Sequence, residues 1–503
     1  MIRGDHPAFG GFLVIEPVNP QYRVLKTLKD HPDPAVRELA RSLRIYTAGN
    51  DQLSPLYVAP LEVNDGVARD EHVETVLGIL KASMPLPGPI LGILAEALER
   101  LYDDVALRPV LANLFVAADE VRAEKRYSGD LNSDIRAAIE VRKGDLTRRI
   151  MGRIFQFPAS IPPVSELMRS FTVIEMNRLT REQACLLSLC VLLTVYEYVR
   201  VNHRANEGLR FVIILEEAHA IVGSNAEAAP SEHFADPRAY ASELICKLLV
   251  ELRAMGVGIV IADQHPSAVA RQVVRTTSSS LIFRATATDD CEDAAASAVM
   301  AGQQMAEMPR LVPGEAFFYR EGFRVARRIR TTDLHSKLGL AVPPSDGELL
   351  SIIEGEEWHL QSKEAESHAR LAEFKHGMDA FDHRRLAILR EWVHAEQRRL
   401  DAVPGAPSGA LGGGRESTHR GRSSKLQARL RQDYERSVKR MYQALVQTPI
   451  PARSGDIELF RSTLVDRFEH VVRPDTEALL ERLGLRASAE LKDNANLETT
   501  NGT

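Results

Sequence analysis

The feature that most constrains the fold is the stretch Leu209–Gly223, LRFVIILEEAHAIVG. Its apolar run from Phe211 to Leu215 predicts a strand that is buried on both faces, as in a parallel sheet. Two carboxylates, Glu216 and Glu217, follow this run directly. Open α/β sheets bind their ligands in the crevice outside the carboxyl ends of the strands. The stretch therefore predicts an acidic ligand site at one edge of a parallel sheet.

Other segments fit the same sheet. Alternation of strands with helices at these lengths favours an α/β fold with a mostly parallel sheet and right-handed crossovers. Thr180–Val201 is a strongly apolar helix with Thr180 as its N-cap, and Glu315–Ile329 alternates around Glu321-Gly322 as a hairpin does. Short apolar runs predict further strands at residues 12–16, 43–47, 171–176, 257–262 and 280–283.

Pattern and composition divide the chain into seven stretches. Residues 403–424 are rich in Pro, Gly and Ser and predict a flexible linker. The expected organisation is a core formed by residues 1–67 and 159–331, a helical insert at 68–158, a charged helical region at 332–402, the linker, a helical C-terminal region at 425–490 and a disordered tail at 491–503.

The length, composition and net charge of the chain limit the class of protein that it can be. Its 503 residues are 44% hydrophobic and 26% charged, as in soluble globular proteins, and its net charge of −6 excludes a chain that is basic throughout. The four cysteines show no metal-type spacing, and no signal peptide is recognised, so we expect a cytoplasmic protein. The longest apolar run, residues 184–196, is shorter than the ~20 residues that span a bilayer, and no membrane partner is expected.

Adjacent carboxylates at a strand end suit the hydrolysis of a nucleoside triphosphate. One can hold the water shell of Mg²⁺, while the other orients or deprotonates the attacking water. Neighbouring residues at a strand end point in different directions, so Glu216 and Glu217 can fill both roles. Alternatively, the two acids only interact favourably with the dipole of a short helix that begins at Ala218. The stretch by itself does not decide between these interpretations.

Three more residues are candidates for the same site. Gln264 follows the predicted strand 257–262, where its amide can bond a γ-phosphate or its water, or can simply belong to a turn. Arg253 ends a helix beside the sheet, and Arg284 ends a strand. Each arginine can reach a phosphate or can be an ordinary surface residue.

A Glu-x-x-His pattern occurs at Glu216–His219 and again at Glu356–His359. On the helices of a bundle, paired copies of this pattern bind a di-iron centre. We discount this chemistry because the first copy follows a β run and the second lies beyond the predicted sheet. His219 is then a partly exposed histidine at the start of a helix.

The sequence contains no phosphate-binding loop of the Walker A type. That loop needs Gly-x-x-x-x-Gly-Lys-Ser/Thr, whose backbone N–H groups and lysine grip the phosphates. None of the lysines in the 503 residues follows a glycine. The pair Gly10-Gly11 lacks the lysine and precedes a strand rather than a helix.

The order of segments over residues 10 to 330 resembles the HerA-like ATPases of the HerA/FtsK DNA-translocase superfamily. EEAH followed by ADQxP is the most specific part of this resemblance. It implies a P-loop NTPase-like (RecA/FtsK-like) core, a hexameric ring, ATP and Mg²⁺ as cofactors, and DNA and a nuclease or other effector as partners. The segments that carry it are FLVIEPVNPQYRVL, LRIYTAGNDQLSPLYVAP, EMNRLTREQA, LRFVIILEEAHAIVG, ELRAMGVGIVIADQHPS and PGEAFFYREG.

The resemblance also implies roles for individual residues. Glu216 is similar to the Walker B carboxylate that binds Mg²⁺ through water, although the superfamily mostly has aspartate there. Glu217 is similar to the catalytic glutamate, and Gln264 to the sensor glutamine. Arg253 and Arg284 fall where the family has arginines, one of which acts as a finger toward a neighbouring subunit.

Glu16, Tyr22 and Arg23 match the family segment that follows the P-loop helix. The family's first strand, P-loop and helix would accordingly precede Met1. A truncated start, a split gene or a subunit without nucleotide binding would each explain this, and we expect the first. The chain is then an incomplete motor subunit that is inactive alone; the alternative is a non-hydrolysing ring subunit or a scaffold for an effector.

The C-terminal third resembles no family. Within it, residues 415–440 hold nine Lys or Arg against three acids. This patch can contact DNA phosphates, but the solvated face of a helix is the favoured interpretation.

Overall fold

The computed structural model describes residues 10–372, apart from 85, 87, 104–108, 126, 204–207, 222–236, 270 and 371. Of these, the residues up to Arg370 belong to one compact unit. The predicted linker, the C-terminal helical region with the basic patch at 415–440, and the tail lie outside the described residues.

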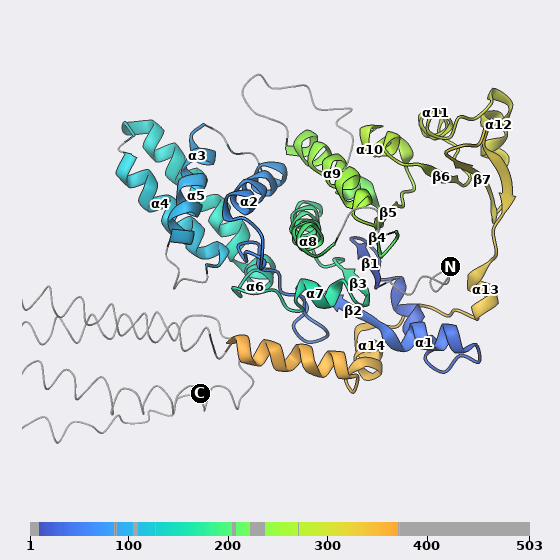
Figure 1. The fold of residues 1–503 in the computed structure, drawn as a ribbon, viewed down its shortest axis with the longest axis horizontal. Coiled ribbons are helices and arrows are strands. Elements are labelled where there is room, and N and C mark those ends of the chain that lie inside the picture. The colour runs from blue at the N-terminus through green and yellow to red at the C-terminus, as the bar shows by residue number, and fades with distance from the viewer. Residues whose placement is uncertain are drawn as a thin grey trace, which may run out of the picture. The chain divides into compact units, whose positions relative to one another are not determined.

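A parallel sheet of five strands forms the core, in the order β2-β3-β1-β4-β5 (Figure 1). The predicted fold class, α/β with a mostly parallel sheet and a helical insert, is therefore confirmed. Every predicted strand from 12–16 to 257–262 is present. The bounds are Gly11–Glu16 for β1, Leu43–Thr47 for β2, Phe171–Glu175 for β3, Phe211–Leu215 for β4 and Val257–Ile261 for β5.

The register of the sheet brings the carboxyl ends of the strands to one edge. Glu175 lies opposite Glu16 on one side and opposite Thr47 on the other. On the other half of the sheet, Leu215 lies opposite both Ile15 and Ile261. Residues that follow β4 and β5 therefore emerge beside the polar ends of β1, β2 and β3.

The start of β1 requires glycine. Gly11 has φ +152°, and a Cβ at this position would lie 2.1 Å from the carbonyl oxygen of Ser170. A side chain there would clash with the backbone that leads into β3. Gly11 thus serves the packing of the central strand.

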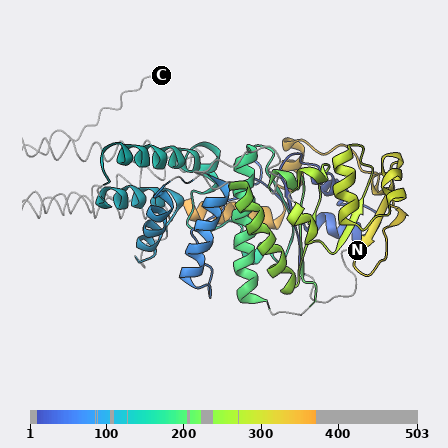
Figure 2. The ribbon, with the colours of Figure 1, turned by 90° about the horizontal axis from the view of Figure 1, so that it is seen from above.

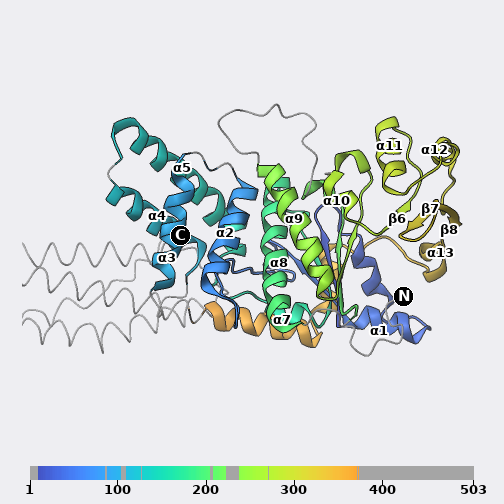
Figure 3. The same cartoon turned by 45° about the horizontal axis from the view of Figure 1, so that its top comes forward.

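The helices that flank the sheet include the predicted apolar one. In α8, Thr180 and Gln183 form a capping box, as the N-cap prediction requires. Among the described residues, α8 is the one helix long and apolar enough to cross a membrane, but 72% of its apolar window is buried; it packs beside α9 (Figure 3). The flanking elements are the 3₁₀ helix η1 (Tyr22–Leu28), α1 (Pro34–Ser42), α7 (Val164–Leu167), α8 (Arg181–Asn202), α9 (Pro237–Ala254) and α10 (Arg271–Arg275).

The insert between β2 and β3 is helical, as predicted for residues 68–158. Its first helix, α2, packs against α8 and α9. The break between its last two helices falls at Arg148, and the next residue, Arg149, has φ +55°. The helices are α2 (Arg69–Ser83), α3 (Ile90–Asp103), α4 (Leu111–Lys125), α5 (Gly129–Thr147) and α6 (Arg149–Ile154).

A second, antiparallel sheet follows β5. The predicted strand at 280–283 is β6 (Ser279–Ile282), and it pairs with β7 (Glu315–Arg320) rather than extending the parallel sheet. The predicted hairpin is confirmed, because β7 pairs with β8 (Arg327–Arg330). The insert and this sheet lie at opposite ends of the unit (Figure 2). Beside the sheet lie α11 (Thr288–Ser297) and α12 (Gly302–Glu307).

Burial in the parallel sheet decreases toward β5. All residues of β1 are buried, whereas Val212 and Ile214 of β4 are only half-buried. The prediction that this strand is buried on both faces is thus wrong for one face, since buried and half-buried residues alternate along it. In β5, Val260 is 48% exposed. The side of the sheet near β5 is its most open part among the described residues.

Residues 332–370 return to the sheet. They contain α13 (Leu334–Leu338), α14 (Asp346–Ile353) and a helix over 357–370. Lys26, which is fully buried, pairs with Glu356 at 2.6 Å, and His359 Nε2 bonds to the carbonyl oxygen of Leu53 at 2.9 Å. The second Glu-x-x-His copy is thus engaged in packing. The compact unit also runs past the boundary predicted at residue 332.

Candidate functional site

A cavity of about 900 Å³ lies at the carboxyl edge of the parallel sheet. Its walls are the segment that follows β1, the residues that follow β4 and β5, and part of the segment that returns after β8. They are formed by residues 16–22, 24 and 25, by Glu216 and Glu217, by residues 262–264, and by His335, Leu340, Ala341 and Pro343.

Glu217 and Gln264 meet in this cavity. Gln264 Nε2 donates a hydrogen bond to Glu217 Oε1 at 2.6 Å. Glu217 has φ 46° and ψ 51°, the left-handed conformation that L-residues other than glycine rarely adopt. Such strained residues cluster at active sites, where the surrounding structure holds them. Two residues that the sequence assigned to one site are therefore brought together.

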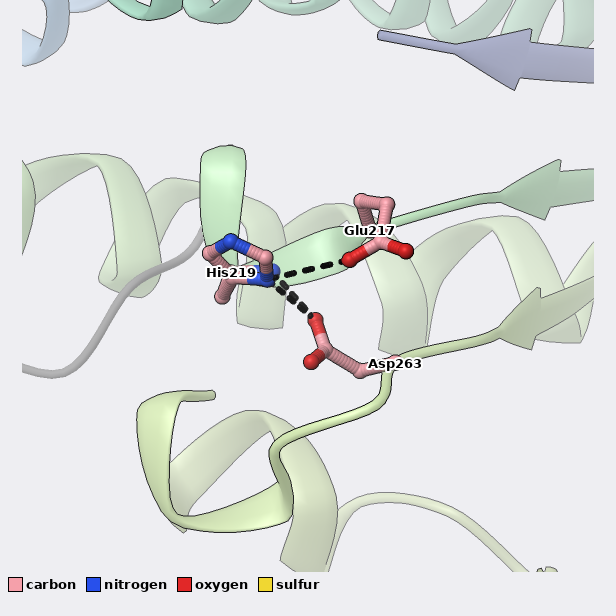
Figure 4. Close-up of side chains that lie close together, drawn as sticks. All are labelled: Glu217, His219 and Asp263. Atoms are coloured by element: carbon pink, nitrogen blue, oxygen red, sulfur yellow. Dashed lines mark hydrogen bonds and ion pairs between the residues drawn. The ribbon is translucent and has the colours of Figure 1, made fainter. Parts of the chain in front are cut away.

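His219 and Asp263 extend this contact (Figure 4). Asp263 Oδ2 accepts hydrogen bonds from the backbone N–H of His219 at 2.7 Å and from its Nδ1 at 2.9 Å. His219 Nδ1 also lies 3.6 Å from Glu217 Oε2. The predicted partly exposed histidine is confirmed, with its side chain 25% exposed. Asp263 was not among the residues that the sequence assigned to the site, so its bond to His219 was missed.

Glu216 contacts the segment that follows β1. The Tyr22 hydroxyl donates to Glu216 Oε1 at 2.5 Å. Glu16, which ends β1, is 4% exposed, and its Oε1 accepts the N–H of Gln21 at 2.7 Å. Its Oε2 is buried without a hydrogen-bond partner. Burial raises the pKa of Glu16 to about 8; the negative charges of Glu175 and Glu216 add to this rise, whereas the Gln21 bond opposes it.

A buried ionic network fixes the segment that follows β1, which forms part of the cavity wall. Arg23 donates from Nε and Nη2 to the two carboxylate oxygens of Glu175, each at 2.7 Å, and Thr47 donates to Glu175 Oε2 at 2.8 Å. Arg23 Nη1 also pairs with Asp346 at 2.7 Å. The pKa of Asp346 lies below its usual range, because Arg23 and Arg178 outweigh the opposing effect of burial. The sequence carries one signal of these buried acids. The apolar runs FLVIE and FTVIE both end in a glutamate, which is Glu16 in the first and Glu175 in the second.

The two predicted arginines lie away from the cavity. Arg253 is in the last turn of α9 and precedes the amino end of β5, so it is at the opposite edge of the sheet from Glu217. Arg284 follows β6 in the second sheet. Both side chains are exposed. A role for either residue toward a neighbouring subunit stays a prediction.

The charges of the cavity suit a metal ion better than a bare polyphosphate. Four carboxylates line it, those of Glu16, Glu216, Glu217 and Asp263, and no Lys or Arg is among the described lining residues. Carboxylate oxygens are ligands of hard divalent cations such as Mg²⁺. An anionic phosphate chain would require cations from elsewhere.

Several solved structures are similar to this chain. VirB4 of Thermoanaerobacter pseudethanolicus has 12% identity and a TM-score of 0.45, over 65% of this chain and 83% of that one. The bacterial conjugative coupling protein TrwBdeltaN70 has 12% identity and a TM-score of 0.44, over 64% and 78%. The genome packaging NTPase B204 from Sulfolobus turreted icosahedral virus 2, in complex with ATP-gammaS, has 10% identity and a TM-score of 0.25, over 34% and 71%.

At these identities and TM-scores the neighbours carry no conclusion about superfamily or activity, and the function has to be argued from the site itself. No protein-family model and no curated protein sequence matches the chain.

Proposed function

We propose that this chain supplies the metal-binding and water-activating half of an ATP hydrolysis site in a HerA/FtsK-type DNA-translocating motor. The observation that supports this most is the bond from Gln264 to a strained Glu217, beside Glu216 and at the edge of the cavity. Acids at the ends of parallel strands, facing a cavity, match the needs of phosphoryl transfer. ATP and Mg²⁺ are the proposed cofactors.

The residues would divide the work as follows. Mg²⁺, when bound with ATP, neutralises the charge that develops on the transferring phosphoryl group. Glu216 holds a water of the ion, and Tyr22 fixes the orientation of Glu216. Glu217 orients the attacking water and accepts its proton, while Gln264 holds the carboxylate of Glu217 in place.

The phosphate-binding loop would come from residues outside this sequence. A Walker A unit is a strand, a glycine-rich loop and a helix in succession. The open edge of β5, where Val260 is 48% exposed, offers a place for one more parallel strand. The carboxyl end of such a strand would lie beside Gln264, and its loop would bring the missing lysine into the cavity.

The remaining assignments are part of the same proposal. We propose that the complete motor acts on DNA in the cytoplasm as a hexameric ring. Arg253 and Arg284 are candidates for a finger toward the neighbouring subunit, because both are exposed and away from their own cavity. A nuclease or another effector is the proposed protein partner.

ATP hydrolysis in the presence and absence of DNA tests this proposal. We expect no activity from the chain as given, and DNA-stimulated activity from a form that includes the segment encoded immediately upstream. Glu217→Gln should abolish that activity. An inactive extended form that folds and carries a Walker A loop would refute the proposal.

A non-hydrolysing ring subunit or scaffold is the second candidate. The acidic cavity without a Lys or Arg among its described lining favours it, because such a cavity alone repels phosphate. The DNA upstream of the Met1 codon separates the two candidates. An in-frame Gly-x-x-x-x-Gly-Lys-Ser/Thr favours the motor, whereas a stop codon followed by a promoter favours the scaffold.

A further inference from the structure

Glu16 is one of two carboxylates of the cavity, with Asp263, that the proposed hydrolysis leaves without a role. It stands at the end of the central strand, is 4% exposed, and lines the cavity. Its Oε1 is satisfied by the N–H of Gln21, whereas Oε2 has no hydrogen-bond partner. A buried polar atom without a partner is costly, and native structures contain few of them. A ligand of Oε2 would remove this cost.

Glu216 is the neighbour that can share this ligand. Its backbone N–H bonds to the carbonyl oxygen of Ile15 at 3.0 Å, which places it beside the end of β1. Its negative charge acts on Glu16 and on Tyr22. Tyr22 donates to Oε1 of Glu216, and within the described part of the chain no hydrogen bond to the second oxygen of that carboxylate is found. Two carboxylates thus lie together with one engaged oxygen each.

We propose that Glu16 Oε2 and the carboxylate of Glu216 together bind one hard divalent cation of the Mg²⁺ type, and that they do so without nucleotide. Mg²⁺ is typically held by one or two carboxylates, with waters completing its shell. The described lining residues include no Lys or Arg that would compete with a cation for these two carboxylates, and a bound cation would replace the proton of Glu16. The inference deepens the proposed function, on which it rests for its biological use, by adding a second metal carboxylate.

The cluster of Glu217, His219 and Asp263 is the rival position for an ion. One ligand atom from each residue lies within 4.8 Å of the others. Asp263 Oδ2, however, already accepts two hydrogen bonds from His219, and Glu217 Oε1 accepts one from Gln264. These atoms have partners without a metal, whereas Glu16 Oε2 has none.

Mn²⁺ binding to the full chain, without nucleotide, tests the inference. Electron paramagnetic resonance measures the free Mn²⁺, and Mg²⁺ should compete for the same site. Glu16→Gln should weaken the affinity by about tenfold or more, because even the loss of a residue that only orients a metal ligand costs about that much. Glu197→Gln is the matched control, because Glu197 is also 4% exposed but does not line the cavity, and it should leave the affinity unchanged.

A second measurement separates the loss of the metal site from misfolding of a variant. Mn²⁺ should raise the thermal midpoint of the wild-type chain, because it binds only the folded state, and Tyr22→Phe should weaken binding by releasing Glu216. The inference is overturned if the wild-type chain binds no Mn²⁺, or if Glu16→Gln binds it as tightly as wild type. Loss of binding in Asp263→Asn alone would place the ion at the rival cluster. None of these outcomes depends on ATP hydrolysis.

Discussion

Gln264 donates a hydrogen bond to Glu217 at 2.6 Å and thereby joins the residues that follow β5 to those that follow β4. The bond holds a carboxylate whose backbone is in the left-handed region. This conformation costs free energy in any residue other than glycine, and the surrounding structure nevertheless holds Glu217 in it. The contact therefore links strain in the backbone to the group that we assign to water activation.

Replacing Glu217 by glycine should reveal that strain. Glycine adopts positive φ without steric cost, so Glu217→Gly should be more stable than Glu217→Ala by about 1 kcal/mol. Both variants lack the carboxylate, and their difference isolates the backbone. Urea denaturation measures it, and equal stabilities would show that the backbone at this position is not strained.

Arg23 and Glu175 should behave as a coupled buried pair. Arg23→Met leaves a fully buried carboxylate without its partner and should lower the free energy of unfolding by about 3–5 kcal/mol. Arg23→Met combined with Glu175→Gln should cost less than the sum of the two single changes. Additive costs in this double-mutant cycle would contradict the coupling.

Glu16 should make stability fall with rising pH. Its pKa is raised to about 8 in the folded chain, from an ordinary value of 4.5. Between these values the folded state holds a proton that the unfolded state has released, so the free energy of unfolding decreases as pH rises, by roughly 3–5 kcal/mol. Denaturation from pH 5 to 8 in EDTA should show this fall, and Glu16→Gln should reduce it. An unchanged slope in that variant would contradict the assignment.

Much of the fold was predictable from local patterns. The strands from β1 to β5 coincide with short apolar runs, and Thr180 caps α8 as its residue type predicts. The helix α4 lies within the predicted helical insert, and its buried residues Leu111, Leu114 and Ala118 are spaced at helical intervals. The pairing of β6 with β7 was not predictable, because it depends on strands distant in sequence.

The site was predictable in part for the same reason. Glu217 and Gln264 were recognised because each follows a buried strand, and their contact follows from adjacent parallel strands. The partnerless Oε2 of Glu16 and the bond from His219 to Asp263 depend on exact side-chain placement, which sequence patterns do not specify. Arg253 was placed beside the sheet correctly, but only the strand direction shows that it lies at the far edge.

The fate of bound ATP in Glu217→Gln, made in the form extended by its upstream segment, is the most direct test of whether Glu217 activates the attacking water. In a single-turnover experiment, we expect this variant to bind ATP and retain it unhydrolysed, while Glu197→Gln hydrolyses it as the unmodified form does. Hydrolysis by Glu217→Gln at the rate of the unmodified form would show that Glu217 does not activate the attacking water.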